Sequence, residues 1–193
     1  MQTQFELKSN QHLLILGKTQ SGKTTLAQWL VKQADYHYVI VDVVGNWLWA
    51  KQQYNYVRLN PHTAQPYLKE LFKRVWKKGN IYLILDETDR YRYTPEMSDL
   101  LNLGANRNIG IMMIASRTTA LHKDMTANTT WTFIFNTKNE TDYKHLKLIY
   151  GGININELMN LAPYHFLLMF DQNMVAKGTL NLQANRLELE YFR

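Results

Sequence analysis

Short apolar runs recur along the whole chain and predict the strands of a sheet. The first run, HLLIL at 12–16, ends at Gly17. Continuous apolar runs bounded by turn residues are typical of strands that are buried on both faces. The strand candidates are 12–16, 38–43, 81–85, 110–115, 131–136, 165–170 and 174–181.

Segments with the apolar spacing of helices lie between these runs. In the clearest of them, at 65–78, apolar residues repeat at i, i+3, i+4, i+7 and i+8. Alternation of strands with helices predicts an α/β fold, a mainly parallel sheet with helices on both faces. The helix candidates are about 23–34, 65–78, 95–105, 140–149 and 155–161.

The end of the chain departs from this alternation. Only Asp171-Gln172-Asn173 separates the last two strand candidates, so we expect them to form a C-terminal antiparallel hairpin at one edge of the sheet. The length of 193 residues suits one domain, and no repeat or low-complexity linker divides it. We therefore expect a single domain over 1–193 with its core at about 12–180.

The first strand candidate leads into a glycine-rich loop. Residues 17–24 read GKTQSGKT and match G-x-x-x-x-G-K-[ST], the P-loop that cradles nucleotide phosphates. A helical pattern opens at Thr24, so the loop amides and the helix N-terminus would point at the phosphates. Lys23 would neutralise the β- and γ-phosphate oxygens, and the Thr24 hydroxyl would hold Mg²⁺. The predicted nucleotide-binding residues are Gly17, Lys18, Thr19, Gln20, Ser21, Gly22, Lys23, Thr24 and Thr25.

A pair of carboxylates follows another buried run. The strand candidate at 81–85 ends in Asp86-Glu87. An aspartate at the tip of a buried strand beside a P-loop can hold the water shell of Mg²⁺, which makes Asp86 a second predicted metal residue. The adjacent Glu87 can polarise an attacking water, so the sequence predicts a hydrolase and not only a binding protein.

Composition narrows the chemistry further. The chain has no cysteine, and its six histidines are scattered, so we expect no metal besides the nucleotide-bound Mg²⁺. The net charge of +6 is compatible with a polyanionic partner. No apolar stretch reaches membrane-spanning length, and the first residues lack the pattern of a signal peptide.

Other classes of P-loop protein fit less well. The segment after the strand at 131–136 lacks the aspartate with which GTPases read guanine. Lys18 stands where partitioning ATPases carry a signature lysine, but Thr19 and Gln20 replace the glycines that normally follow it. The arginine-rich lid of a small-molecule kinase is not seen.

Four stretches, taken together, resemble one family. The first three are the P-loop from Ile15 to Leu26, VIVD at 39–42 with the turn GNW at 45–47, and LILDE at 83–87. The fourth and most specific runs from Gly104 to Phe135 and holds RNIG at 107–110, the strand IMMIASR at 111–117, LHKD at 121–124 and the strand at 131–135. In these stretches the chain resembles the FtsK/HerA family of nucleic-acid pumps. It is most similar to the small genome-packaging ATPases of tailless double-stranded DNA viruses with internal membranes.

The resemblance implies a fold, a substrate and partners. It implies an ASCE-type, RecA-like P-loop NTPase that hydrolyses ATP with Mg²⁺ and moves double-stranded DNA of any sequence. It further implies a homo-oligomeric ring, a capsid or portal-vertex protein as partner, and a place in the host cytoplasm or on the virion. The family's sensor strand usually ends in a glutamine that reads the γ-phosphate, and Arg117 stands there.

Arginines and two loops are the candidates for contacts between subunits and with DNA. In ring pumps an arginine of the next subunit reaches the nucleotide, and Arg107, followed by Arg90 and Arg92, would supply it here. The segments 45–51 (GNWLWAK) and 90–93 (RYRY) combine basic and aromatic residues. Both suit a loop that lines a DNA channel, and both suit subunit packing, which we favour for the tryptophans.

Two other functions stay open. An assembly or secretion ATPase would share this fold, although such proteins usually carry a membrane-spanning segment. A non-catalytic nucleotide-binding module would use ATP only to set its assembly state, and the intact Asp86-Glu87 pair argues against that.

Overall fold

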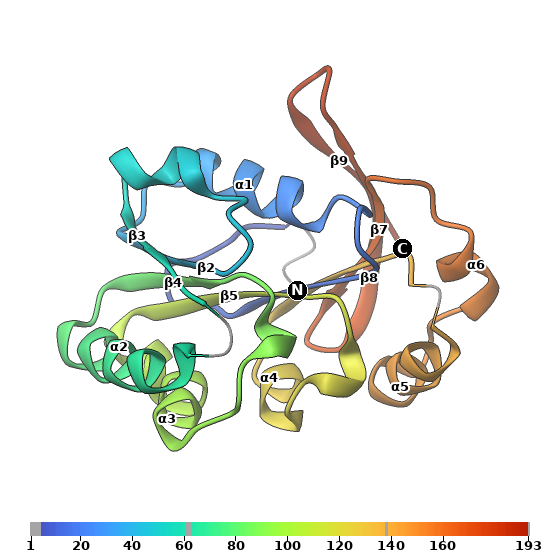
Figure 1. Ribbon diagram of the computed structural model, residues 1–193. Helices are drawn as coiled ribbons and strands as arrows, with labels where there is room; N and C mark the ends of the chain where they lie inside the picture. The colour runs from blue at the N-terminus through green and yellow to red at the C-terminus, as the bar shows by residue number, and fades with distance from the viewer. Residues whose placement is uncertain (1–4, 61–62, 138, 193) are drawn as a thin grey trace.

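One nine-stranded sheet organises the part of the chain that the computed structural model describes, residues 5–60, 63–137 and 139–192 (Figure 1). The strand order is β3-β2-β4-β5-β1-β6-β7-β8-β9. The strands from β3 to β6 in this order are parallel, and the pairs from β6 to β9 are antiparallel. The strands are β1 (Leu13–Leu16), β2 (Tyr38–Asp42), β3 (Asn55–Arg58), β4 (Ile81–Leu85), β5 (Ile109–Ala115), β6 (Trp131–Phe135), β7 (His165–Phe170), β8 (Asn173–Asn181) and β9 (Arg186–Tyr191).

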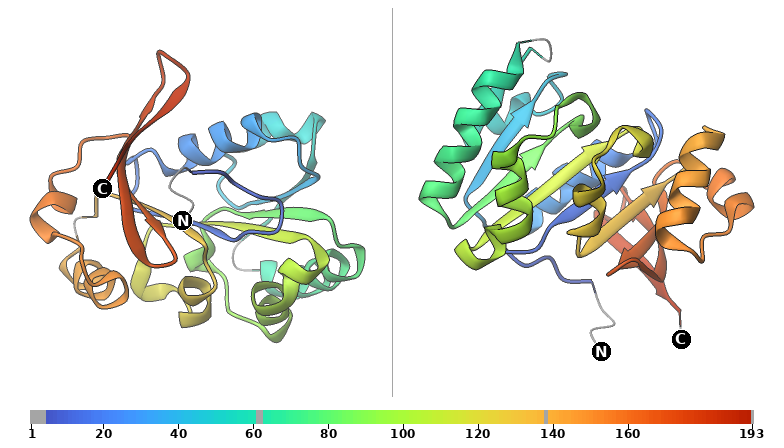
Figure 2. Two further views of the ribbon diagram at one scale, coloured as in Figure 1. Left: turned by 180° about the vertical axis from the view of Figure 1, so that it is seen from behind. Right: turned by 90° about the horizontal axis from the view of Figure 1, so that it is seen from below.

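Helices cover both faces of the sheet, as predicted. The helix α1 lies on one face, and α2, α3, α4 and α5 lie across the other (Figure 2, right). The helices are α1 (Lys23–Gln33), α2 (Ala64–Lys78), α3 (Pro95–Leu103), α4 (Lys123–Ala127), α5 (Glu140–Tyr150) and α6 (Ile155–Met159). Short 3₁₀ turns are η1 (Leu48–Gln52), η2 (Thr88–Arg90), η3 (Gly104–Arg107) and η4 (Thr118–Ala120).

The pleat of the central strands divides the core into two layers. Leu13 and Ile15 of β1 pack toward α1, while Leu14 and Leu16 pack into the layer beneath α2 to α6. Successive side chains of a strand point to opposite faces, so a strand with helices on both sides must be apolar throughout. All four residues of β1 are buried for this reason.

The predicted elements form, and the C-terminal antiparallel hairpin is confirmed as β7–β8. Its turn uses left-handed backbone at Asp171 (φ 44°) and Gln172 (φ 66°), which matches the twist of a tight hairpin. Two strands that we did not predict, β3 and β9, occupy the outermost positions of the sheet. Both are partly exposed and lack a continuous apolar run, which is why the sequence did not predict them. Because β9 pairs with β8, the edge of the sheet is β9 and not the predicted hairpin. Among the described residues no helix is both long and apolar enough to cross a bilayer.

A buried histidine lies just before β1. His12 is 4% exposed, and its Nε2 lies 3.0 Å from the carbonyl oxygen of Leu101 in α3. Burial lowers the pKa of His12 from 6.5 to about 4, because a charged imidazolium loses its hydration there. The folded protein therefore holds His12 neutral at pH values where the unfolded chain would protonate it.

This difference predicts an acid-sensitive contribution to stability. Between about pH 6.5 and about pH 4 the unfolded chain binds a proton that the folded protein does not, so stability falls as the pH drops. From pH 7 to pH 5 the loss through His12 should reach about 2 kcal/mol, at about 1.4 kcal/mol per pKa unit. Urea unfolding at both pH values should show a shallower loss for His12→Gln than for the wild type. An equal loss in both proteins would contradict this account.

Candidate active site at the carboxyl edge of the sheet

The P-loop follows β1 and depends on its two glycines. Gly17 has φ 149° and Gly22 has φ 109°. A Cβ at Gly17 would lie 2.6 Å from Cβ of Phe135, and one at Gly22 would lie 2.7 Å from Cδ1 of Tyr164. Both positions combine left-handed backbone with close packing, so only glycine fits them without rearrangement.

Two segments from elsewhere in the chain hold the loop. The amide of Lys18 donates to the carbonyl oxygen of Asn136 at 2.8 Å, directly after β6. The amide of Tyr164 donates to the carbonyl oxygen of Ser21 at 2.9 Å. Sequence reasoning missed both partners. Asn136 follows a buried strand, which was a weak signal, whereas nothing in the pattern singled out Tyr164.

The sheet brings the P-loop and the acidic pair to one edge. The strand β5 lies between β1 and β4 and pairs with both in parallel. Parallel strands place their carboxyl ends together, so Gly17, Asp86 and the residues after Ala115 meet there. Open parallel sheets usually bind ligands at this edge.

Lys23 is the charged centre of this edge. It is 6% exposed, and its Nζ donates to the carbonyl oxygen of Lys18 at 2.9 Å. Burial lowers the pKa of Lys23, and the negative charges of Glu87, Asp89 and Asp86 oppose that shift. The structure thus places the predicted P-loop lysine within electrostatic range of both predicted carboxylates. It adds Asp89, which sequence reasoning missed.

Asp86 is fully buried at the tip of β4. Its Oδ2 accepts a hydrogen bond from Nε1 of Trp47 at 3.1 Å and from Nδ2 of Asn46 at 3.5 Å, and its Oδ1 accepts from the amide of Glu87 at 3.1 Å. Burial, together with the charge of Glu87, raises the pKa of Asp86 to about 6. A buried carboxylate with a raised pKa is short of positive charge, so a divalent cation nearby would stabilise its ionised form.

The backbone of Glu87 is strained. Its φ of 54° is left-handed, which costs a residue with a long side chain about 1–3 kcal/mol. Its Oε2 lies 3.2 Å from Nε of Arg90, and the two side chains are 21% and 55% exposed. A half-exposed ion pair is worth only about 0–1 kcal/mol, so Glu87 can exchange Arg90 for a water with little cost.

The residues predicted to hold Mg²⁺ on the nucleotide fit that ion. Thr24 supplies a hydroxyl in the first turn of α1, and Asp86 supplies a buried carboxylate at the tip of β4. Hard oxygen ligands suit Mg²⁺, which keeps several waters and shares the phosphates of its nucleotide. No group of three or more acidic or histidine side chains within the described ranges forms a metal site by itself. The donor set therefore fits a metal that arrives with the nucleotide.

Arg117 follows β5 at the same edge, and its backbone is fixed from two sides. Its amide donates to Oδ2 of Asp89 at 3.2 Å. The buried Oδ1 of Asp142 accepts from the amide and hydroxyl of Thr118, both at 3.0 Å, and from those of Thr119 at 3.2 and 3.1 Å. The side chain of Arg117 is exposed and makes no ion pair or hydrogen bond with any described residue. Sequence reasoning missed Asp142, which holds the turn from α5.

Arg107 lies at the opposite edge, before the amino end of β5. Its Nε donates to the carbonyl oxygen of Trp76 at 2.8 Å, and its Nη2 donates to that of Lys77 at 3.2 Å. It therefore caps the end of α2 and does not join the P-loop of its own chain. We predicted that it reaches the nucleotide of the next subunit, not the one bound to its own chain. An action on a neighbouring subunit stays a prediction.

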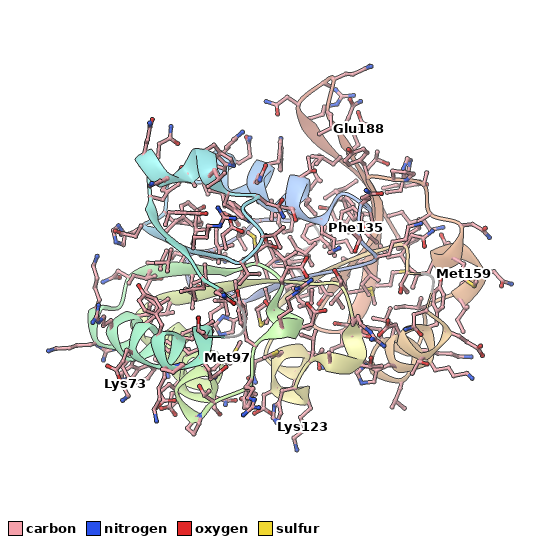
Figure 3. All side chains as sticks on the ribbon, in the orientation of Figure 1. Lys73, Met97, Lys123, Phe135, Met159 and Glu188 are labelled. Carbon is pink, nitrogen blue, oxygen red and sulfur yellow. The ribbon has the colours of Figure 1, made fainter. Side chains whose placement is uncertain are left out.

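In the two predicted loops the aromatic residues are buried or half-buried and the basic residues are exposed. Trp47 is fully buried and packs within its own chain, so it does not line a channel or a subunit surface. Tyr91 is also buried, and its hydroxyl donates to the carbonyl oxygen of Asp86 at 2.9 Å. Arg90 and Arg92 are exposed. Lys73 of α2 and Lys123 of α4 also point away from the sheet, on the side that α2 to α5 cover (Figure 3).

The strand order and the P-loop define the fold of a P-loop ATPase, which confirms the predicted fold class. No protein-family model and no curated protein sequence matches the chain. Solved structures do match it over nearly its full length.

The similar structures include two viral packaging proteins. The genome packaging NTPase B204 from Sulfolobus turreted icosahedral virus 2, in complex with AMPPCP, has a TM-score of 0.71 and 16% identity, covering 95% of this chain and 98% of that one. The DNA-packaging ATPase B204 from Sulfolobus turreted icosahedral virus has a TM-score of 0.65 and 18% identity, and the match covers 97% of this chain and 100% of that one. EssC (ATPases 2 and 3) from Geobacillus thermodenitrificans has a TM-score of 0.66 and 14% identity, and the match covers 97% of this chain and 40% of that one. At such identities the likeness establishes a shared fold.

Proposed function

We propose that this protein hydrolyses ATP and couples the reaction to movement of double-stranded DNA during packaging of a viral genome. The observation that carries the proposal is the meeting of Lys23, Asp86 and Glu87 at one sheet edge beside the P-loop. The match in fold and length to viral packaging ATPases supports the packaging role.

The proposed reaction uses groups that the structure brings together. Lys23 exchanges the carbonyl oxygen of Lys18 for the β- and γ-phosphate oxygens of ATP. Thr24 and Asp86 would hold Mg²⁺, which would neutralise phosphate charge. Glu87 leaves Arg90, orients a water for in-line attack on the γ-phosphorus, and accepts its proton as the bond to ADP breaks. Arg117 stabilises charge on the transferred phosphoryl group from the tip of β5.

A ring would complete the site and grip the DNA. A cation from the next subunit would add to the charge that stabilises the transition state, and Arg107, Arg90 and Arg92 are the candidates. Arg90 and Arg92 stand at the P-loop edge, whereas Arg107 is anchored on the end of α2. In a ring, exposed basic residues of each subunit would contact DNA phosphates without reading the bases. We further infer a capsid or portal-vertex partner and a place in the host cytoplasm or on the virion.

A second function rests on the likeness to EssC. Its ATPase modules share this fold across 97% of the chain, so an ATPase that drives assembly or secretion of proteins is the alternative. Such an ATPase would not need DNA for turnover. A non-catalytic module is disfavoured, because Glu87 keeps a strained, partly exposed carboxylate beside the P-loop.

Removal of the proposed base should separate binding from hydrolysis. Glu87→Gln keeps the shape of the side chain but cannot accept the proton, so turnover should fall roughly 10²–10⁴-fold. Binding of ATP, measured by titration calorimetry, should stay near the wild-type level. The matched control is Glu140→Gln, which changes an exposed glutamate in α5 and should leave both quantities unchanged. Loss of ATP binding in Glu87→Gln would show that Glu87 is structural.

The response to DNA should separate the packaging function from its alternatives. Phosphate release should rise when double-stranded DNA is added, whatever its sequence. The logarithm of DNA affinity should fall with the logarithm of salt at about −0.9 per phosphate neutralised. Arg92→Ala should reduce this slope by about 1, and the control Lys144→Ala, on the outer side of α5, should not. An ATP turnover rate that does not change when DNA is added would favour a secretion ATPase. A DNA affinity that depends on the base sequence would contradict a DNA pump.

A further inference from the structure

A buried hydrogen bond ties the candidate metal aspartate to a tryptophan from another part of the chain. Nε1 of Trp47 donates to Oδ2 of Asp86 at 3.1 Å, and both side chains are fully buried. The neighbouring Asn46 reaches the same oxygen at 3.5 Å. Within the described residues, all donors to Oδ2 of Asp86 therefore come from the turn after β2.

The turn itself is held in place by several contacts. Oδ1 of Asp42 accepts from the amides of Val44 at 3.0 Å and Gly45 at 2.7 Å, and its Oδ2 accepts from the amide of Trp47 at 3.0 Å. Such an arrangement fixes the backbone at the strand end in the manner of an Asx turn. The backbone that carries the indole is thus held independently of Asp86.

The turn also contacts the P-loop helix and the neighbouring strand. Nε2 of Gln28 in α1 donates to the carbonyl oxygen of Asn46 at 2.7 Å. The strands β2 and β4 are parallel neighbours with Val41 opposite Leu85, so Asp42 and Asp86 follow at adjacent strand tips. Trp47 bridges the two tips and places its N–H against the carboxylate.

A carboxylate that holds the water shell of a metal must keep one orientation. Oδ1 of Asp86 accepts the amide of Glu87, and the indole fixes the other oxygen. An indole N–H donates once and accepts nothing. Among the described residues Oδ1 accepts only the amide of Glu87, so it keeps a lone pair for a metal-bound water. Partners of this kind orient metal ligands, and their loss typically weakens metal affinity about 10–100-fold.

We propose that Trp47 is a positioning residue, which holds the carboxylate of Asp86 in the orientation that the Mg²⁺ of the bound nucleotide requires. The inference rests on the proposed function, since it takes Asp86 as the residue that holds the water shell of that ion. Trp47 itself touches neither the nucleotide nor the metal.

The test compares two tryptophans that stand two residues apart. Trp47→Phe removes the N–H and keeps most of the ring. Trp49→Phe is the matched control, because the Trp49 ring stacks on Trp47 with the ring centroids 6.1 Å apart, while its buried Nε1 has no hydrogen-bond partner among the described residues. The measurements are Mn²⁺ binding to the complex with a non-hydrolysable ATP analogue, by electron paramagnetic resonance, and binding of the analogue without metal.

Trp47→Phe should raise the Kd for Mn²⁺ about 10–100-fold and leave metal-free binding of the analogue within about twofold. Trp49→Phe should change neither. Equal Mn²⁺ binding in both variants and the wild type would overturn the proposal. So would a parallel loss of metal-free binding in Trp47→Phe, which would indicate a collapsed P-loop and a role in packing only.

If Trp47→Phe does not fold, the proposal is tested on the wild-type protein by nuclear magnetic resonance of its indole N–H groups. One of its five indole N–H resonances should shift when Mg²⁺ is added to the analogue complex, and that shift should vanish in Asp86→Asn. The absence of such a signal would overturn the proposal. If Asp86→Asn weakens Mn²⁺ binding and turnover but Trp47→Phe does not, only this inference fails. If neither the wild type nor any variant binds metal with nucleotide or releases phosphate, the proposed function itself fails.

Discussion

The buried carboxylate of Asp86 is the constraint on which the rest of this edge depends. A negative charge without exposure to water is costly unless hydrogen bonds and positive charge surround it. The fold meets this demand with donors from separate elements, the indole of Trp47 after β2 and the amide of Glu87 after β4. Lys23, from the P-loop, adds the nearby positive charge. These groups converge only because the strands that carry them run in parallel.

The two-layered core supplies the rigidity that such a site needs. The strands β1, β4 and β5 are apolar on both faces, so their tips are fixed by packing above and below the sheet. The P-loop then leaves β1 against Phe135 and Tyr164, which approach its glycines too closely for any side chain. Asp142 likewise fixes the turn after β5 and leaves the side chain of Arg117 exposed. The groups that would meet a nucleotide are thus held by residues that would not touch it.

The sequence predicted the parts of this arrangement that are local. A buried run, a glycine loop and a helix lie in succession, and Asp86-Glu87 directly follows another buried run. The outer strands β3 and β9 were missed because each is partly exposed and has no continuous apolar run. Asp142 and Tyr164 were missed, and Trp47 was assigned to a channel or subunit surface, because their partners lie far along the chain and no periodic pattern records such contacts. The predicted action of Arg107 on a neighbouring subunit depends on contacts between chains, which the pattern of one sequence does not record.

A structure of the protein with Mg²⁺ and a non-hydrolysable ATP analogue tests the central claim most directly. The account predicts that Nζ of Lys23 leaves the carbonyl oxygen of Lys18 for the β- and γ-phosphates. It also predicts that Mg²⁺ contacts the Thr24 hydroxyl and lies one water from Asp86, with the bond from Trp47 intact. Phosphates bound away from residues 17–25, or a metal with no water bridge to Asp86, would contradict it.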